Sequence, residues 1–200
     1  MPDLRDSSSG SESEPSGVLL RPGRIGDLER LTTIYNHWVR ESAWTLDLDE
    51  VTLEERRAWF DRHGPSGRHR LIVAEVDGRV AGWSASTAYR PRRGFDATVE
   101  TSVYLDPLCT GRGLGTRLYR ALLEALRSED VHRVVAAITL PNPASIALHE
   151  RLGFARVGCF RECGRKHGRF WDVLWMERGV EPGDGPRVPG SETPAPAACR

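Results

Sequence analysis

The order of apolar patterns along the 200-residue chain predicts an α/β domain with a mixed, largely antiparallel central sheet flanked by helices. Asp77-Gly78 separates two alternating segments and is the strongest hairpin signal in the chain, so it predicts an antiparallel pair. A further alternating segment, 97–105, leads into a glycine-rich loop and then a helical pattern. The strand after this helix is expected to lie parallel to segment 97–105, because a helical crossover returns the chain in the same direction.

Alternating or apolar runs bounded by turn residues predict the strands. The first is short, the next three form a meander, one follows the glycine-loop helix, and the last two form a hairpin. The predicted strands are Val18 to Arg21, Arg70 to Val76, Arg79 to Thr87, Ala97 to Leu105, Arg133 to Thr139, Ala155 to Phe160 and Phe170 to Met176.

Capping signals mark the ends of the predicted helices. Asp27 is predicted as the N-cap of the first helix. Thr52, with Glu55 three residues later, has the pattern of a capping box for the second. Gly153 is predicted as the residue that ends the fourth. The predicted helices cover Leu28 to Trp38, Leu53 to Arg62, the segment around Leu118 to Leu126, and Asn142 to Arg151.

Equal numbers of basic and acidic residues, 28 of each, give the chain a net charge near zero. This balance argues against non-specific binding to nucleic acid or to an anionic membrane, both of which need a basic excess. The sequence shows no apolar run close to the roughly 20 residues that cross a bilayer. Its polar N-terminus has no signal-like segment. We therefore expect a cytoplasmic protein.

Composition also predicts the limits of the folded domain. Residues 1–17 are rich in Ser, Glu, Asp and Pro, and residues 181–200 are rich in Pro, Gly and Ala, which is typical of disordered tails. The folded domain is expected over residues 18–180. The four cysteines include no second pair at metal-ligand spacing, so we interpret them as free thiols and expect no metal site.

The glycine-rich loop before the third helix has the properties of an anion-binding loop. Gly111, Gly113 and Gly115 allow the backbone to approach a ligand closely, and the helix N-terminus that follows favours negative charge. No Lys-Ser/Thr pair follows, which excludes a Walker A loop, and the glycine spacing differs from a dinucleotide-binding fingerprint. The loop therefore predicts binding of a phosphate or pyrophosphate.

Several short motifs follow one another over nearly all of Leu20 to Trp175. They are Tyr35-Asn36-His37-Trp38, Val73-Ala74-Glu75-Val76-Asp77-Gly78 with Val80-Ala81-Gly82, Val99-Glu100-Thr101-Ser102-Val103-Tyr104, Leu140-Pro141-Asn142-Pro143-Ala144-Ser145, Leu148-His149-Glu150-Arg151-Leu152-Gly153-Phe154, and Lys166-His167-Gly168 with Trp171-Asp172-Val173. Together they resemble the GNAT superfamily of N-acetyltransferases and, within it, the phosphinothricin N-acetyltransferase group. The resemblance implies the GNAT fold, acetyl-CoA as co-substrate, a small-molecule amine as acceptor, and a homodimer.

The resemblance also implies where acetyl-CoA binds. The backbone of Val103, Tyr104 and Leu105 would hold the pantetheine arm like an added strand. Asn142 would hydrogen-bond that arm, with Ser145 nearby; a simple helix cap is the alternative role for Asn142. The pyrophosphate would lie on Gly111, Arg112, Gly113, Leu114, Gly115 and Thr116.

One position of this loop departs from the family pattern. Thr110 stands where the family has Gln or Arg, and Arg112 is expected to supply the missing positive charge. A CoA-binding protein without catalytic activity therefore remains an alternative function.

Glu100 is the first candidate catalytic residue. By strand alternation it shares a face with Ser102 and Tyr104, beside the expected cofactor. A carboxylate at this place can take the proton of the substrate amine, directly or through water, and an ammonium cannot attack a thioester until that proton is gone. The alternative is a half-exposed glutamate held in a salt bridge.

His149 is the second candidate catalytic residue. It stands where many GNAT enzymes have a tyrosine that is proposed to protonate the departing CoA thiolate, and histidine exchanges protons near neutral pH. The alternative is a packed helix histidine without a role in proton transfer.

The family resemblance places the acidic end of the substrate at Arg90 and Arg92, since guanidinium groups pair with carboxylate or phosphinate through two hydrogen bonds. Phe95 stands where the family has an aromatic residue, often tyrosine, and the aromatic residue usual after Thr45 is absent. From the resemblance and the two arginines, we expect the substrate to be a small amino acid or analogue such as phosphinothricin, methionine sulfoximine or methionine sulfone. Another small amine is the alternative, although the arginines argue against a cationic substrate.

Overall fold

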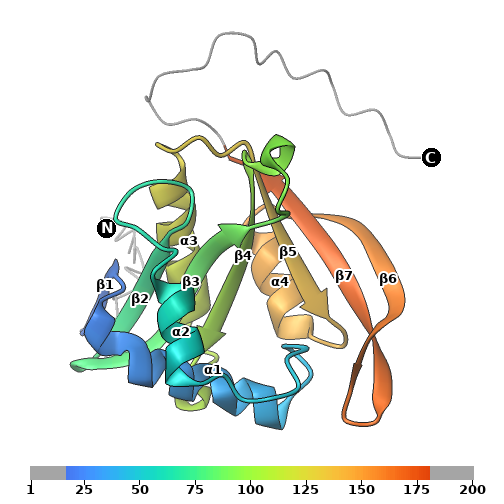
Figure 1. Cartoon of the computed structure of the whole chain (residues 1–200), viewed down its shortest axis with the longest axis horizontal. Coiled ribbons are helices and arrows are strands. Elements are labelled where there is room, and N and C mark those ends of the chain that lie inside the picture. Colours follow the sequence, from blue (N-terminus) through green and yellow to red (C-terminus); the bar gives the residue numbers. More distant parts are fainter. Residues whose placement is uncertain (1–16, 181–200) are drawn as a thin grey trace, which may run out of the picture.

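The computed structural model describes residues 17–180, which form a seven-stranded sheet with helices on both faces (Figure 1). The strand order is β1-β2-β3-β4-β5-β7-β6, and β4 and β5 are the one parallel pair within these residues. The predicted mixed, largely antiparallel sheet is therefore confirmed. The strands are β1 (Val18–Pro22), β2 (Leu71–Val76), β3 (Arg79–Ala88), β4 (Thr98–Leu105), β5 (Arg133–Thr139), β6 (Ala155–Lys166) and β7 (Arg169–Gly179). The α-helices are α1 (Leu28–Glu41), α2 (Leu53–Phe60), α3 (Leu114–Leu126) and α4 (Pro143–Arg151).

The local signals that predicted turns and helix ends act as expected. The N–H of Glu55 donates to the Thr52 hydroxyl at 3.2 Å, and the Glu55 carboxylate accepts from the Thr52 N–H at 2.8 Å, which completes the capping box of α2. Asp77 and Gly78 both have positive φ, 49° and 75°, as a tight hairpin between β2 and β3 requires. Gly153, with φ 79°, follows the end of α4.

Two local predictions hold only in part. Asp27 is the N-cap residue of α1, as predicted, but its side chain makes no capping hydrogen bond to that helix. Its carboxylate instead accepts from the backbone N–H of Arg24 at 2.7 Å and pairs with Arg21 at 2.8 Å, because a short 3₁₀ turn, Ile25–Asp27, precedes the helix. The last two strands are also longer than predicted, since register irregularities between Phe160 and Gly164 let pairing resume after the regular alternation ends.

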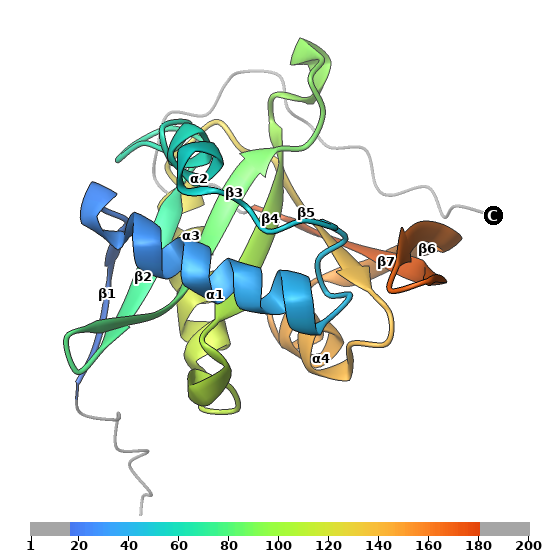
Figure 2. The same ribbon diagram turned by 60° about the horizontal axis from the view of Figure 1, so that its bottom comes forward.

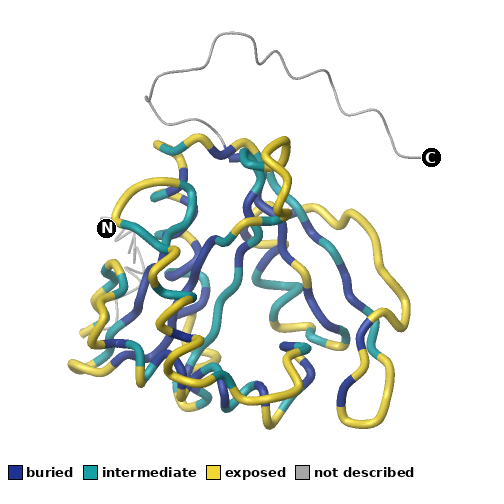
Figure 3. The backbone as a smooth tube through the Cα atoms, in the orientation of Figure 1, coloured by how far each residue is buried: buried dark blue, intermediate teal, exposed yellow. Residues whose placement is uncertain are grey.

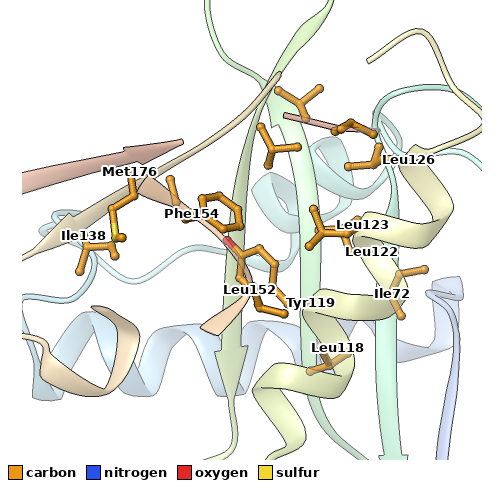
Figure 4. Packing of buried hydrophobic residues seen from close by; sticks show 14 of the residues in the cluster. Ile72, Leu118, Tyr119, Leu122, Leu123, Leu126, Ile138, Leu152, Phe154 and Met176 are labelled. Atoms are coloured by element: carbon orange, nitrogen blue, oxygen red, sulfur yellow. The ribbon is translucent and has the colours of Figure 1, made fainter. Parts of the chain in front are cut away.

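The two faces of the sheet pack against different helices. On β2, Ile72 and Ala74 belong to the apolar cluster that α3 completes, while Leu71 and Val73 belong to the cluster completed by α1. This is the alternation expected of a strand that is buried on both faces. Figure 4 shows the first cluster, in which leucines along α3 point at the sheet.

Strands β4 and β5 separate soon after they begin to pair. Their paired positions run from Thr98 with Arg133 to Glu100 with Val135, although β4 continues to Leu105 and β5 to Thr139. Figure 2 shows the two strands diverging toward α1 and α4. The separation leaves the β5-facing backbone of β4 unpaired beyond Glu100, and it opens the sheet at its centre.

Strand β6 forms one edge of the sheet, and most of it is exposed (Figure 3). Within residues 17–180, no helix is long and apolar enough to cross a bilayer. The predicted tails lie outside the described residues, apart from Gly17. Cys109, Cys159 and Cys163 are free thiols as predicted, while Cys199 lies in the undescribed C-terminal part.

Candidate active site

A cleft of about 660 Å³ lies where β4 and β5 separate, between α3 and α4. It brings together all the predicted catalytic and cofactor-binding residues except Arg112. A second cavity, of about 710 Å³, lies on the outer side of α3 among arginine side chains, and no predicted site residue lines it. The predicted residues that line the cleft are Glu100, Val103, Tyr104, Leu105, Gly111, Gly113, Leu114, Gly115, Thr116, Asn142, Ser145 and His149.

The floor of the cleft is the start of α3. Gly111 and Gly113 have φ 75° and 74°, a left-handed conformation that suits glycine best. Gly113 is the N-cap and makes no side-chain hydrogen bond to the first turn, so the first backbone N–H groups of α3 remain available to an anion. Thr110 lines the cleft, but its hydroxyl donates to the Pro107 carbonyl at 3.0 Å. Arg112 is exposed and is absent from the cleft lining.

One wall of the cleft is the free side of β4, with two tryptophans beside it. The indole N–H of Trp38 donates to the Leu105 carbonyl at 2.8 Å, and Trp44 donates to the Pro141 carbonyl at 3.3 Å. The two rings lie 4.9 Å apart. Trp38, which the sequence analysis named within a family motif but not as a site residue, lines the cleft.

Glu100 occupies the last paired position of β4 and is half-buried in the cleft. Burial raises the pKa of this carboxyl above its usual range, and the nearby charge of Arg90 opposes the shift. Among residues 17–180 no basic side chain lies within ion-pair distance of the Glu100 carboxylate, so the salt-bridge alternative finds no support there. An unpaired carboxylate with a raised pKa is chemically suited to accept a proton.

His149 is 3% exposed and both of its ring nitrogens are hydrogen-bonded. Nδ1 lies 2.8 Å from the Ser145 carbonyl oxygen, which can only accept, so Nδ1 carries the proton. Nε2 then accepts from the hydroxyl of Tyr119, 2.8 Å away. Burial lowers the pKa of His149, which favours this neutral form. The imidazole is therefore held in one tautomer and one orientation.

Tyr119 is a site residue that the sequence reasoning missed. Its ring is fully buried beneath the cleft, and its hydroxyl lies 2.8 Å from both His149 and the Thr101 hydroxyl. It follows Leu118 on the buried face of α3, where the other large side chains are aliphatic (Figure 4). The Tyr119 hydroxyl is a single polar group on an otherwise aliphatic helix face. This feature of the sequence could have indicated that Tyr119 belongs to the site.

The remaining predicted residues, Arg90, Arg92 and Phe95, lie on the segment between β3 and β4, which projects from the sheet (Figure 2). They do not line the cleft. Arg90 is close enough for its charge to lower the pKa of Glu100. Phe95 packs edge-on against Tyr89, with ring centroids 5.8 Å apart. The structure thus brings Arg90 near Glu100, while Arg92 and Phe95 lie on the same segment and do not line the cleft.

The loop after α1 is tied to the β6–β7 hairpin. Lys166, 3% exposed, donates to the Thr45 carbonyl at 2.8 Å, and His167 approaches the Ser42 carbonyl at 3.3 Å. Since Trp44 lines the cleft, these contacts hold one edge of it in place. Among residues 17–180, no three His, Cys, Asp or Glu side chains gather closely enough to hold a metal ion.

Comparison with known families agrees with this geometry. Residues 31–154 match the acetyltransferase (GNAT) family. The chain belongs to this family. GNAT relatives include a phosphinothricin N-acetyltransferase of Streptomyces coelicolor, 47% identical over 80% of this chain and 95% of that protein. An L-methionine sulfoximine/L-methionine sulfone acetyltransferase of Pseudomonas aeruginosa is 37% identical over 82% of this chain and 95% of its own length.

Solved GNAT structures have the same fold. The phosphinothricin acetyltransferase of Sinorhizobium meliloti, determined in complex with acetyl-CoA, superposes with a TM-score of 0.78. The alignment covers 90% of this chain and 96% of the other, with 30% sequence identity. Acetyl-CoA is therefore the co-substrate that the family relationship supports.

Proposed function

We propose that this GNAT protein transfers the acetyl group of acetyl-CoA to the amine of a small amino acid or analogue, of the phosphinothricin, methionine sulfoximine or methionine sulfone type. The observation that carries the proposal is the unpaired, half-buried Glu100 carboxylate at the point where β4 and β5 separate. The names of the relatives support the substrate class. A cytoplasmic location, where acetyl-CoA is available, and a homodimer are part of the same proposal.

The thioester supplies an activated acetyl group, and the protein's part is to hold it and to manage protons. The pantetheine arm extends along the free backbone of Val103 to Leu105, and the pyrophosphate lies at the N-terminus of α3. Asn142, whose side chain accepts from the Ser145 N–H at 3.1 Å, caps α4 and keeps its amide nitrogen for the cofactor arm. These contacts would place the acetyl group of bound acetyl-CoA near Glu100, which lines the same cleft.

Glu100 takes a proton from the substrate ammonium, and the free amine attacks the thioester carbonyl. The tetrahedral intermediate then collapses, the carbon–sulfur bond breaks, and the thiolate needs a proton. We assign this step to Tyr119 and His149 together: the Tyr119 hydroxyl gives its proton to sulfur, and the second proton lost by the substrate nitrogen after attack restores that hydroxyl. Neutral His149 accepts the hydrogen bond of 2.8 Å from Tyr119 at Nε2 and so holds the hydroxyl in place.

The proposed function is tested by incubating the purified protein with acetyl-CoA and each of a panel of amines, and following free thiol. The panel contains L-phosphinothricin, L-methionine sulfoximine, L-methionine sulfone, a polyamine and an aminoglycoside. Thiol release is expected with the amino acids. Release with only the cationic amines would contradict the substrate class. Binding of acetyl-CoA without release for any amine would favour the non-catalytic alternative.

A further inference from the structure

Arg56, on α2, is a buried charge without a protein partner. It is 3% exposed, and its Nε and Nη2 atoms have no hydrogen-bond acceptor among residues 17–180. Burying a guanidinium is costly unless its N–H groups are paired, and burial lowers the pKa of Arg56. A residue with this cost and no structural partner is a candidate for ligand binding.

Aromatic rings hold the Arg56 guanidinium in place. The Tyr35 centroid lies 4.4 Å from it, that of Trp59 4.8 Å and that of Trp83 5.6 Å. Cation–π attraction offsets part of the desolvation. Ring faces provide no in-plane acceptor for the N–H groups at the edge of the guanidinium. The cage therefore orients Arg56 and leaves two donors unused.

The unused donors belong to a side chain that lines a cavity of about 200 Å³ next to the cleft. Ser102 and Tyr104 line both the cavity and the cleft, so the two spaces share a wall. Ser102 lies two residues from Glu100 on the same face of β4, which is about 6.6 Å along a strand. That separation matches the span from the amine to the end of a short amino-acid side chain.

We propose that this cavity receives the distal end of the amino-acid substrate, and that Arg56 donates two hydrogen bonds to a tetrahedral sulfur or phosphorus centre bearing two acceptor atoms. The inference rests on the proposed function and adds the group that recognises the substrate side chain. The planar fork of a guanidinium matches two such acceptors. Arg90 and Arg92 then remain for the α-carboxylate.

Asp47 sets the charge that the cavity favours. Its carboxylate lines the cavity and accepts a hydrogen bond from the Tyr35 hydroxyl at 2.6 Å. The charges of Asp47 and Arg56 cancel, so a neutral sulfone or sulfoximine fits better than an anionic phosphinate. The structure therefore predicts that L-methionine sulfone is used more efficiently than L-phosphinothricin.

The test uses Arg56→Met, which removes the donors and keeps the aliphatic stem, with Arg57→Met as the matched control. Arg57 is the next residue on α2, but it is exposed and pairs with Asp61. The ratio of kcat/KM for L-methionine sulfone to that for L-methionine, which lacks the sulfonyl oxygens, is measured for each protein. Arg56→Met is expected to lower this ratio at least tenfold, whereas Arg57→Met leaves it unchanged. An unchanged ratio in Arg56→Met would overturn the proposal and would indicate that the cavity holds water rather than the substrate side chain.

Two further measurements separate this inference from the proposed function. The melting temperature of Arg56→Met is expected to be no lower than that of Arg57→Met, because an unpaired buried charge is removed; a large fall would indicate a structural role. Calorimetric titration of L-methionine sulfone does not require turnover. If the wild type acetylates neither amine but binds the sulfone, and Arg56→Met loses that binding, the proposed function fails and the inference stands. Absence of sulfone binding to the wild type would overturn the inference.

Discussion

The two sides of strand β4 differ in the kind of group they offer to a ligand. On the side that faces β5 and α3, the cleft offers backbone: the free edge of β4 and the first N–H groups of α3 after Gly113. The buried polar side chains there, Thr101, Tyr119 and His149, are hydrogen-bonded to one another.

Glu100, which lines the cleft, and Arg56, which lines the smaller cavity, offer charged side chains instead. The Glu100 carboxylate and the Arg56 guanidinium are both at least half-buried, and neither is paired with a side chain among residues 17–180. Leaving such groups unpaired costs free energy of folding, which is a recurrent property of binding and catalytic sites.

The difference corresponds to what each side has to recognise. Acetyl-CoA is the cofactor in the solved relative from Sinorhizobium meliloti, and recognition of a cofactor by backbone depends on the fold rather than on particular side chains. The amine differs between relatives whose names cite different amino-acid analogues, and side chains can change without altering the fold. Four substitutions test this division, from the largest expected effect to the smallest.

Glu100→Gln is expected to lower kcat by at least about 100-fold, the usual range for loss of a general base, while acetyl-CoA affinity is unchanged. The base must be deprotonated to act, and burial raises the pKa of Glu100. In the wild type, kcat/KM should therefore fall as the pH drops through that raised pKa, and this limb should be absent from Glu100→Gln. A variant that keeps the wild-type turnover and the acidic limb would remove Glu100 from the mechanism.

Tyr119→Phe is expected to cost about 1–3 kcal/mol in the free energy of unfolding, because buried atoms of His149 and Thr101 lose a partner. Denaturant unfolding measures the effect, with Tyr89→Phe as control, since the Tyr89 hydroxyl makes no hydrogen bond within the described residues. A comparable loss in both variants would show that the network adds nothing specific. Turnover should also fall if Tyr119 delivers the proton to the thiolate.

Gly113→Ala is expected to raise the KM for acetyl-CoA roughly tenfold, because alanine disfavours the left-handed conformation by about 1–2 kcal/mol and the free loop then leaves it, so that binding has to restore it. The KM for the amine should not change, because the substitution affects the cofactor side alone. Gly26→Ala, at an exposed position with open space around it, is the control. Equal changes in the KM for acetyl-CoA and the KM for the amine would contradict the proposed separation between cofactor recognition and amine recognition.

Arg112→Ala is expected to have the smallest effect, a rise of no more than about threefold in the KM for acetyl-CoA, because an exposed charge contributes about 0.2–1 kcal/mol. Steady-state kinetics at two salt concentrations provide the measurement, and the effect should shrink at high salt. If the KM does not change at low salt, Arg112 does not compensate for Thr110.

Local signals predicted much of the fold and part of the site. Asp77-Gly78, the capping box at Thr52 and the glycine loop act within a few residues, so their neighbours in sequence are also their neighbours in space. Asp27 stands at the predicted N-cap position of α1, but its side chain makes no capping hydrogen bond there, for the opposite reason. Its carboxylate pairs with Arg21 on β1. The ion pair with a side chain on another element is more favourable than a hydrogen bond to the nearby helix terminus.

The sequence by itself determined the order of strands and helices, the anion-binding loop and the position of Glu100 on its strand, because these follow from periodicity, capping and backbone conformation. Only the tertiary structure showed that β4 and β5 separate after Glu100, that Tyr119 meets His149, and that Arg56 lies buried among three aromatic rings. Each of these depends on contacts between residues far apart in the chain. Such contacts form when the sheet and helices pack, and no local pattern encodes them.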